Sequence, residues 1–143
     1  MCAVASLLVT GAEVSPVSAK TVNGCVIKAK TKCLKADLKG ANLKGANLKG
    51  ANLTNTNLTN TNLTNTNLTN TNLTNTNLTN TNLTNTNLTN TNLTNTNLTG
   101  ADLKNVDLAT NLTGANLTGV TWSNTTCPGS VTNTGCDVPV LRS

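Results

Sequence analysis

The chain has 143 residues, a length that suits one domain, and a formal net charge of +5 at pH 7. Phe, Tyr and His are absent, Trp122 is the sole aromatic residue, and charged residues make up 10% of the chain. This composition excludes a core built on bulky aromatic side chains and any catalysis that needs an imidazole base. So polar a chain is typical of disorder, unless regularly spaced apolar residues override that expectation.

Residues 1–19 are expected to be a secretory signal peptide. Residues 3–12 are small and apolar, and Val17-Ser18-Ala19 fits a cleavage site made of small residues. No basic segment precedes the apolar stretch, so an ordinary apolar N-terminal arm is the alternative. Cleavage would give a secreted or periplasmic protein that starts at Lys20. No other segment has the roughly 20 apolar residues that a membrane-spanning helix needs.

Four cysteines lie outside the first 19 residues. Cys25 and Cys33 fall in segment 20–35, which we expect to cap one end, and Cys127 and Cys136 fall in segment 123–143, an expected cap or tail. Four cysteines allow three pairings. The short separations favour Cys25–Cys33 and Cys127–Cys136. A zinc site is the alternative, but it would need ligands from both ends to meet, so we expect neither metal nor cofactor.

Between these segments the sequence repeats with a period of five over residues 36–122. The repeating unit is (Ala/Thr)-(Asp/Asn)-Leu-X-X, and Thr-Asn-Leu-Thr-Asn occurs eight times in succession from Thr56 to Asn95. The leucines expected to line the core are Leu38, Leu43, Leu48, Leu53, Leu58, Leu63, Leu68, Leu73, Leu78, Leu83, Leu88, Leu93, Leu98, Leu103, Leu108, Leu112 and Leu117.

A period of five suits neither a helix nor a flat strand. Residues five apart spiral off any single helix face, and in a strand they point to opposite faces. The consistent solution is a backbone that turns a corner in every unit and directs each Leu to a common axis. Successive coils would then be hydrogen-bonded at roughly the 4.8 Å spacing of neighbouring strands.

These units resemble the pentapeptide-repeat family over about residues 31–122. The resemblance implies an all-β fold, a right-handed quadrilateral β-helix with four units per coil. The repeat is long enough for about four coils, and the two cysteine pairs would staple the ends. The resemblance also implies that the central Leu and the small residue two positions before it point inward, while the other three face solvent. Some members of the family dimerise through capping helices or exposed ends; no capping helix is evident here, so the oligomeric state stays open.

The sequence departs from the family pattern in three places. The inward small residue is Thr at every fifth position from Thr56 to Thr96, and its hydroxyl needs a partner, either local backbone or the Thr of the next coil. The spacing from Leu108 to Leu112 is four, which predicts a tightened corner. Residues 123–143 carry no repeat. Trp122 stands where the next central Leu would fall, so it either plugs the end of the core or lies exposed in a tail.

The pattern argues against catalysis. The acids outside the first 19 residues are scattered, and the adjacent pair Asp102 and Asp107 would project from different faces, a poor arrangement for acid–base work. Eight of the ten basic residues lie between Lys20 and Lys49. Lys39, Lys44 and Lys49 occupy the same outward position of consecutive units, so they should ring the first coil rather than line a groove. With no aromatics to stack bases, nucleic acid is an improbable partner.

The outward residues suggest the function. We expect a non-enzymatic structural scaffold or interaction rod whose protein or surface partner the sequence does not name. The alternative is binding to ice or another regular surface through stacked rows of Thr and Asn. The candidate rows are Thr54, Thr74 and Thr94, and Thr59, Thr79 and Thr99. A further alternative is implied by the family, some of whose members mimic DNA and inhibit DNA gyrase; that role needs acidic rows, and neutral residues stand there.

Overall fold

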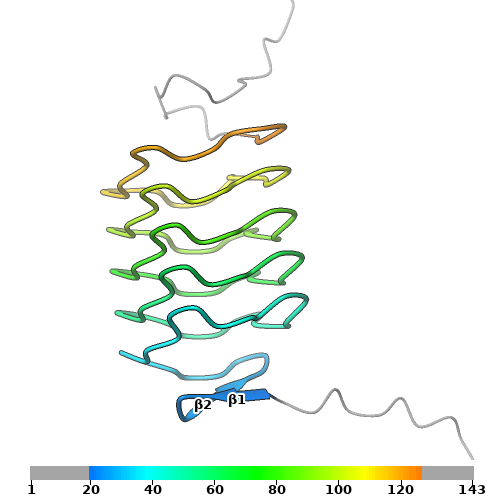
Figure 1. The fold of residues 1–143 in the computed structure, drawn as a ribbon, viewed down its shortest axis with the longest axis vertical. Coiled ribbons are helices and arrows are strands. Elements are labelled where there is room, and N and C mark those ends of the chain that lie inside the picture. Colours follow the sequence, from blue (N-terminus) through cyan, green and yellow to red (C-terminus); the bar gives the residue numbers. More distant parts are fainter. Residues whose placement is uncertain (1–19, 127–143) are drawn as a thin grey trace, which may run out of the picture.

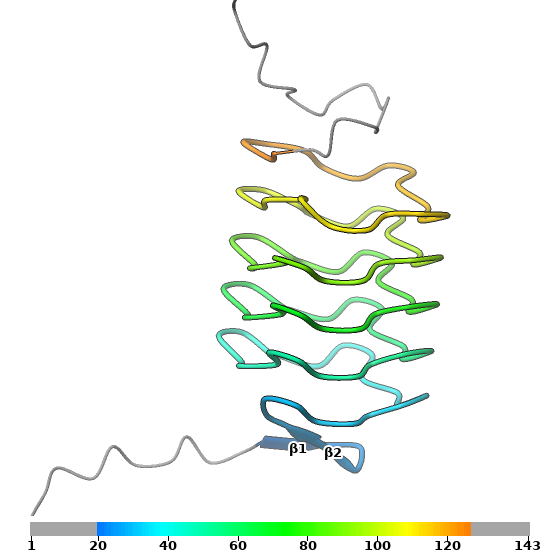
Figure 2. The same cartoon turned by 180° about the vertical axis from the view of Figure 1, so that it is seen from behind.

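The protein is a rod of stacked, four-sided coils (Figures 1 and 2). The computed structural model describes residues 20–126; residues 1–19, with the expected signal peptide, and residues 127–143, with Cys127 and Cys136, lie outside the described part. The two strands longer than an isolated bridge in the described part are β1 (Lys20–Val22) and β2 (Cys25–Ile27). Within residues 20–126 no helix is long and apolar enough to cross a membrane.

Parallel bridges join residues 20 apart, so one coil consists of four five-residue units. The bridged positions stack into four columns, which we call faces A to D. Face A contains Lys32, Asn52, Asn72, Asn92 and Asn111, and face B contains Asp37, Asn57, Asn77, Asn97 and Asn116. Face C contains Asn42, Asn62, Asn82, Asp102 and Thr121. Face D contains Asn47, Asn67 and Asn87 and, in the next two coils, Asp107 and Thr126, but Asn87 and Asp107 are not bridged to each other. Four complete coils and most of a fifth follow from these columns, slightly more than the sequence predicts.

A typical corner is a turn closed by one main-chain hydrogen bond. At a representative corner the N–H of Thr76 donates to the carbonyl oxygen of Leu73 over 3.1 Å. Asn75, the residue before Thr76, has a φ of 55°, and Gly100 occupies the equivalent position of another unit with a φ of 67°. Asn and Gly are the residues that enter this left-handed region at least cost. The Asn or Gly at the last position of most units therefore allows the chain to turn the corner.

The hydrophobic core runs along the axis of the rod and consists mainly of leucine side chains. Every central Leu from Leu38 to Leu108 is at most 2% exposed. Full burial of a Leu side chain contributes about 1.5–3 kcal/mol, so the repeated Leu supplies most of the hydrophobic stabilisation of the rod. Leu112, Leu117 and Trp122 belong to the last coil and pack against the core, but they are only partly buried because little of the described chain lies above them. Trp122 therefore sits against the end of the core instead of projecting into solvent.

The buried threonines bond across coils. The hydroxyl of Thr61 donates to the carbonyl oxygen of Leu38 in the coil beneath over 3.0 Å, and that of Thr76 donates to Leu53 over 2.9 Å. The same bond recurs at each inward Thr from Thr56 to Thr96. The expected partners, local backbone or the Thr of the next coil, are wrong. The carbonyl oxygen of the coil beneath is the acceptor, because its second lone pair points up the stack and is otherwise unused.

The four-residue spacing after Leu108 tightens one corner, as expected, at a cost in hydrogen bonds. The parallel bridges change from a separation of 20 to one of 19, for example Asn92 to Asn111. Thr110 takes the inward position immediately after the shortened unit, and its main-chain N–H donates to Leu108 over only two residues. Its hydroxyl is the one buried side-chain group without a hydrogen-bond partner among residues 20–126.

A β-hairpin lies across the first coil at the N-terminal end (Figure 1). Strands β1 and β2 pair antiparallel, with Val22 opposite Cys25. Asn23 and Gly24 connect them with positive φ values of 45° and 77°, the combination of a two-residue type I′ turn. The predicted Cys25–Cys33 disulfide is present, with the two Cα atoms 5.5 Å apart, and ties the hairpin to the first coil.

Candidate functional site

Most units from residue 51 on present an Asn and a Thr on the outer surface, one on either side of the inward Leu. The Asn side chain is fixed locally: the oxygen of Asn72 accepts the main-chain N–H of Thr74 at 3.0 Å and its hydroxyl at 2.7 Å. Both side chains of the pair are thus held in one conformation before any partner arrives. The Thr oxygen remains an acceptor, and the Asn amide NH₂ group remains a donor.

Faces A and B carry this pair without interruption over four coils, and we call these eight pairs the A/B surface. In every pair the Thr hydroxyl donates to the Asn side-chain oxygen over 2.6–2.8 Å. The pairs are Asn52–Thr54, Asn72–Thr74, Asn92–Thr94 and Asn111–Thr113 on face A, and Asn57–Thr59, Asn77–Thr79, Asn97–Thr99 and Asn116–Thr118 on face B. All six threonines of the sequence-derived rows lie on this surface, partly exposed.

Faces C and D are less regular. In the described residues the hydroxyls of Thr64 and Thr69 make no bond to the preceding Asn, and that of Thr84 turns to Asp102 instead. Lys104 and Ala109 replace Thr in the fourth coil. The A/B surface has no charged residue from position 51 to 60, 71 to 80, 91 to 100 or 110 to 119. From residue 51 on, faces A and B are therefore neutral and uniform, and faces C and D are not.

The acidic residues within the described part of the chain form no site. Asp102 lies on face C and Asp107 on face D. Each carboxylate accepts the main-chain N–H two residues later, from Lys104 at 3.0 Å and from Ala109 at 3.1 Å. Within residues 20–126 no group of three or more His, Cys, Asp or Glu side chains could hold a metal ion. The carboxylates of Asp102 and Asp107 therefore stabilise local turns of the backbone.

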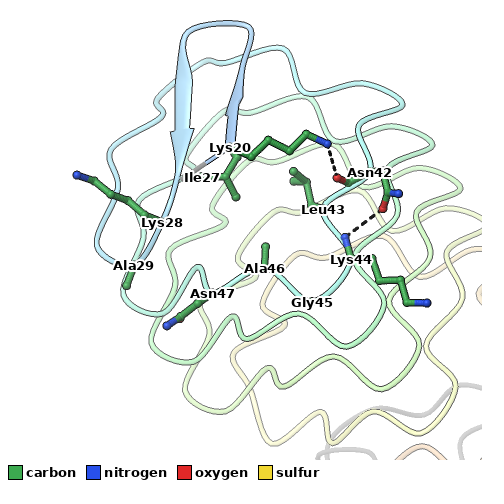
Figure 3. Close-up of a pocket in the computed structure, with 10 residues that line it drawn as sticks. All are labelled: Lys20, Ile27, Lys28, Ala29, Asn42, Leu43, Lys44, Gly45, Ala46 and Asn47. Atoms are coloured by element: carbon green, nitrogen blue, oxygen red, sulfur yellow. Dashed lines mark hydrogen bonds between the residues drawn. The ribbon is translucent and has the colours of Figure 1, made fainter. Parts of the chain in front are cut away.

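A cavity of about 420 Å³ lies between the hairpin and the first coil (Figure 3). Ile27, Leu43 and Ala46 contribute its apolar lining. Lys20 reaches across to the main-chain oxygen of Asn42, at 2.9 Å, whereas the lining residues Lys28 and Lys44 direct their ammonium groups outward. Sequence reasoning missed this cavity because it did not foresee the hairpin, although Asn23-Gly24 was a usable signal for one.

Comparison with known sequences and structures identifies the class of protein. A sequence profile for pentapeptide repeats matches residues 36–75 and 71–108, with eight copies. The chain therefore belongs to the pentapeptide-repeat family, and its fold is the right-handed quadrilateral β-helix. No curated protein matches the chain.

Several solved structures of pentapeptide repeat proteins are similar to this chain. HetL, a pentapeptide repeat protein involved in heterocyst differentiation regulation in the cyanobacterium Nostoc, has a TM-score of 0.67 and 24% identity; the match covers 72% of this chain and 49% of HetL. Rfr23 from the cyanobacterium Cyanothece has 30% identity and a TM-score of 0.42, with 68% of this chain and 91% of Rfr23 covered. A protein of the Arabidopsis thaliana thylakoid lumen has 28% identity and a TM-score of 0.42, with 71% and 64% covered. This chain thus spans about half the length of HetL.

Proposed function

We propose that the protein is a non-enzymatic interaction rod that binds an extended partner through the A/B surface. The observation that carries the proposal is the unbroken set of eight hydrogen-bonded Asn–Thr pairs on two adjacent faces, which carry no charge from residue 51 to 119. A partner meets donors and acceptors that are already oriented, so little conformational entropy is lost on binding. The scattered, turn-bound carboxylates support the absence of catalysis.

The rod suits a partner that is itself regular. Coils repeat at roughly 4.8 Å, so each row of Thr or Asn offers the same group at that interval. Insoluble glycans such as cellulose, chitin and peptidoglycan are suitable probes. We expect the protein to pellet with at least one of them.

Replacing outward Thr by Lys tests which face is used, because Lys39, Lys44, Lys49 and Lys104 show that this position accepts Lys. Thr74→Lys with Thr79→Lys places two charges on the A/B surface, and Thr69→Lys with Thr89→Lys places two on face D. Loss of pelleting with the first pair and retention with the second would support the proposal. Equal behaviour of the two variants would refute the role of the A/B surface.

Ice is the second candidate, favoured by the Thr rows Thr54, Thr74 and Thr94 and Thr59, Thr79 and Thr99. Asn side-chain oxygens accept their hydroxyls at 2.6–2.7 Å, so the same hydrogen bond holds every hydroxyl within each row. An assay of ice recrystallisation inhibition with the same two Lys variants tests it. No inhibition by the unmodified protein at high micromolar concentration would refute ice binding.

A gyrase-directed DNA mimic has less support, since faces A and B lack acidic rows between positions 51 and 119.

We further propose export, with cleavage after Ala19. The Cys25–Cys33 disulfide supports this, because disulfides persist mainly in oxidising compartments. N-terminal sequencing of the protein from its native cell tests export: Lys20 as the first residue supports it, and an uncut chain contradicts it.

A further inference from the structure

The charge of the rod is concentrated at one end. Residues 20–50, which form the hairpin and the first coil, contain eight lysines and one aspartate, a net charge of +7. Residues 51–126 contain one lysine and two aspartates, a net charge of −1. We call residues 20–50 the basic end. A molecule with this polarity is attracted to an anionic partner by that end and not by its shaft.

Lysines of the first coil surround the axis of the rod. Lys39 follows the bridge position of face B, Lys44 that of face C and Lys49 that of face D. No lateral face collects them, so a partner lying along the rod, such as a nucleic acid duplex, would meet only some of the charge. A flat partner that meets the rod end-on lies about equally close to all of them.

The basic end also exposes apolar side chains. Leu34 is 55% exposed and Val26 is 37% exposed, and they are the large hydrophobic residues most exposed in the described part of the chain. Each follows a half-cystine of the Cys25–Cys33 disulfide, whose Cα atoms are 5.5 Å apart, so both residues belong to the part of the chain that this link holds together. Val26 alternates with the buried Cys25 and Ile27 in strand β2, and therefore points away from the first coil.

The position of Leu34 in the repeat makes its exposure unusual. The equivalent residues in the coils above it are Thr54, Thr74 and Thr94. An outward Leu therefore occurs on face A only in the first coil, which also carries the lysines. The open cavity between the hairpin and faces C and D of the first coil adds the apolar surface of Ile27, Leu43 and Ala46, with Lys28 and Lys44 directed outward from its rim (Figure 3).

We propose that the basic end docks on an anionic lipid surface, with Leu34 and Val26 entering the headgroup region. Basic residues around a few apolar ones are the combination that binds such interfaces, since electrostatic attraction and apolar insertion act together. The A/B surface, which lies along the shaft, would stay free for its own partner. This inference does not rest on the proposed function of that surface.

Vesicle co-sedimentation of the full chain tests the proposal, with phosphatidylcholine vesicles that contain or lack phosphatidylglycerol. We expect binding to the anionic vesicles at low salt and release at about 1 M salt, where screening acts within about 3 Å. The triple variant Lys39→Thr, Lys44→Thr, Lys49→Thr takes the residues of the next coil, so its fold should be kept. We expect it to bind at least about tenfold more weakly. Lys104→Thr, the same change on the shaft, should bind as the unmodified chain does.

The double variant Val26→Thr, Leu34→Thr tests insertion. It should weaken binding to anionic vesicles while leaving the salt dependence in place. Equal binding to vesicles with and without phosphatidylglycerol, or unchanged binding by the triple Lys variant, would overturn the proposal. So would binding to soluble double-stranded DNA that is as tight as lipid binding and unaffected by Leu34→Thr, since this would assign the basic end to a nucleic acid. Residues 1–19 are the same in every variant and cannot produce these differences.

Discussion

The hydroxyl of Thr76 donates a hydrogen bond over 2.9 Å to the carbonyl oxygen of Leu53, one coil below. The same carbonyl oxygen accepts the main-chain N–H of Thr56 within its own coil, over 3.1 Å. One acceptor therefore closes a corner and joins two coils. This explains how Thr can replace Ala at an inward position: the hydroxyl is buried, but its donor is used.

Removing one of these hydroxyls should destabilise the rod. Thr76→Val keeps the shape of the side chain and deletes the hydrogen bond, so we expect the free energy of unfolding to fall by about 1 kcal/mol. The reverse change is available at Ala101, which lies above Leu78 where an inward Thr would reach its carbonyl oxygen. Ala101→Thr should raise the free energy of unfolding by up to about 1 kcal/mol. Urea denaturation measures both, and a loss of stability in Ala101→Thr would contradict the account.

Thr110 should respond in the opposite sense to Thr76. Its hydroxyl is buried without a partner, so Thr110→Val removes a group that was desolvated without compensation. We expect the free energy of unfolding to stay the same or to rise by about 1 kcal/mol. Thr76→Val, measured beside it by urea denaturation, is the matched comparison. If both variants lose the same stability, the hydrogen-bond explanation fails and the methyl contacts dominate.

The corner position should discriminate between Gly and Ala. Asn75 has a φ of 55°, where a residue with a Cβ pays about 1–2 kcal/mol unless its side chain bonds locally. We expect Asn75→Ala to lower the free energy of unfolding by about 1 kcal/mol. Asn75→Gly should change it far less, because Gly already stands at corners such as Gly40 and Gly100. Thermal melts followed by circular dichroism would compare them; equal losses would show that the side chain of Asn75, rather than its backbone, is what matters.

The Cys25–Cys33 disulfide should stabilise the N-terminal end. It closes a short loop with a sequence separation of 8, and such a link contributes about 2–3 kcal/mol by restricting the unfolded chain. We expect Cys25→Ser to lower the melting temperature while the β-rich circular dichroism signal below the transition is retained. An unchanged melt would show that the hairpin does not cap the core. Cys127→Ser should act in the same way if the second expected disulfide forms.

The sequence predicted the coil and its core because each Leu is fixed by a period that only a four-sided winding satisfies. It did not predict the hairpin, since strands of three residues are too short to show a pattern. Nor did it predict the acceptors of the buried hydroxyls, which lie 23 residues earlier in the chain. The repeat unit alone also does not show how the four faces differ. Identical units fall on all four sides, and only the 20-residue alignment places Asp102, Lys104 and Asp107 together on faces C and D.

The most direct test of the coil is a pair of engineered thiols. Thr74 and Thr94 follow bridged positions of face A and lie one coil apart, at roughly the 4.8 Å strand spacing, which is within the range of a disulfide. Thr84 lies on face C, opposite Thr74. Cys2, Cys127 and Cys136 would be replaced by Ser in every variant, and free thiols counted after mild oxidation of the monomer. The coil predicts closure in Thr74→Cys/Thr94→Cys and two free thiols in Thr74→Cys/Thr84→Cys. Closure of the second pair as readily as the first would contradict four units per coil.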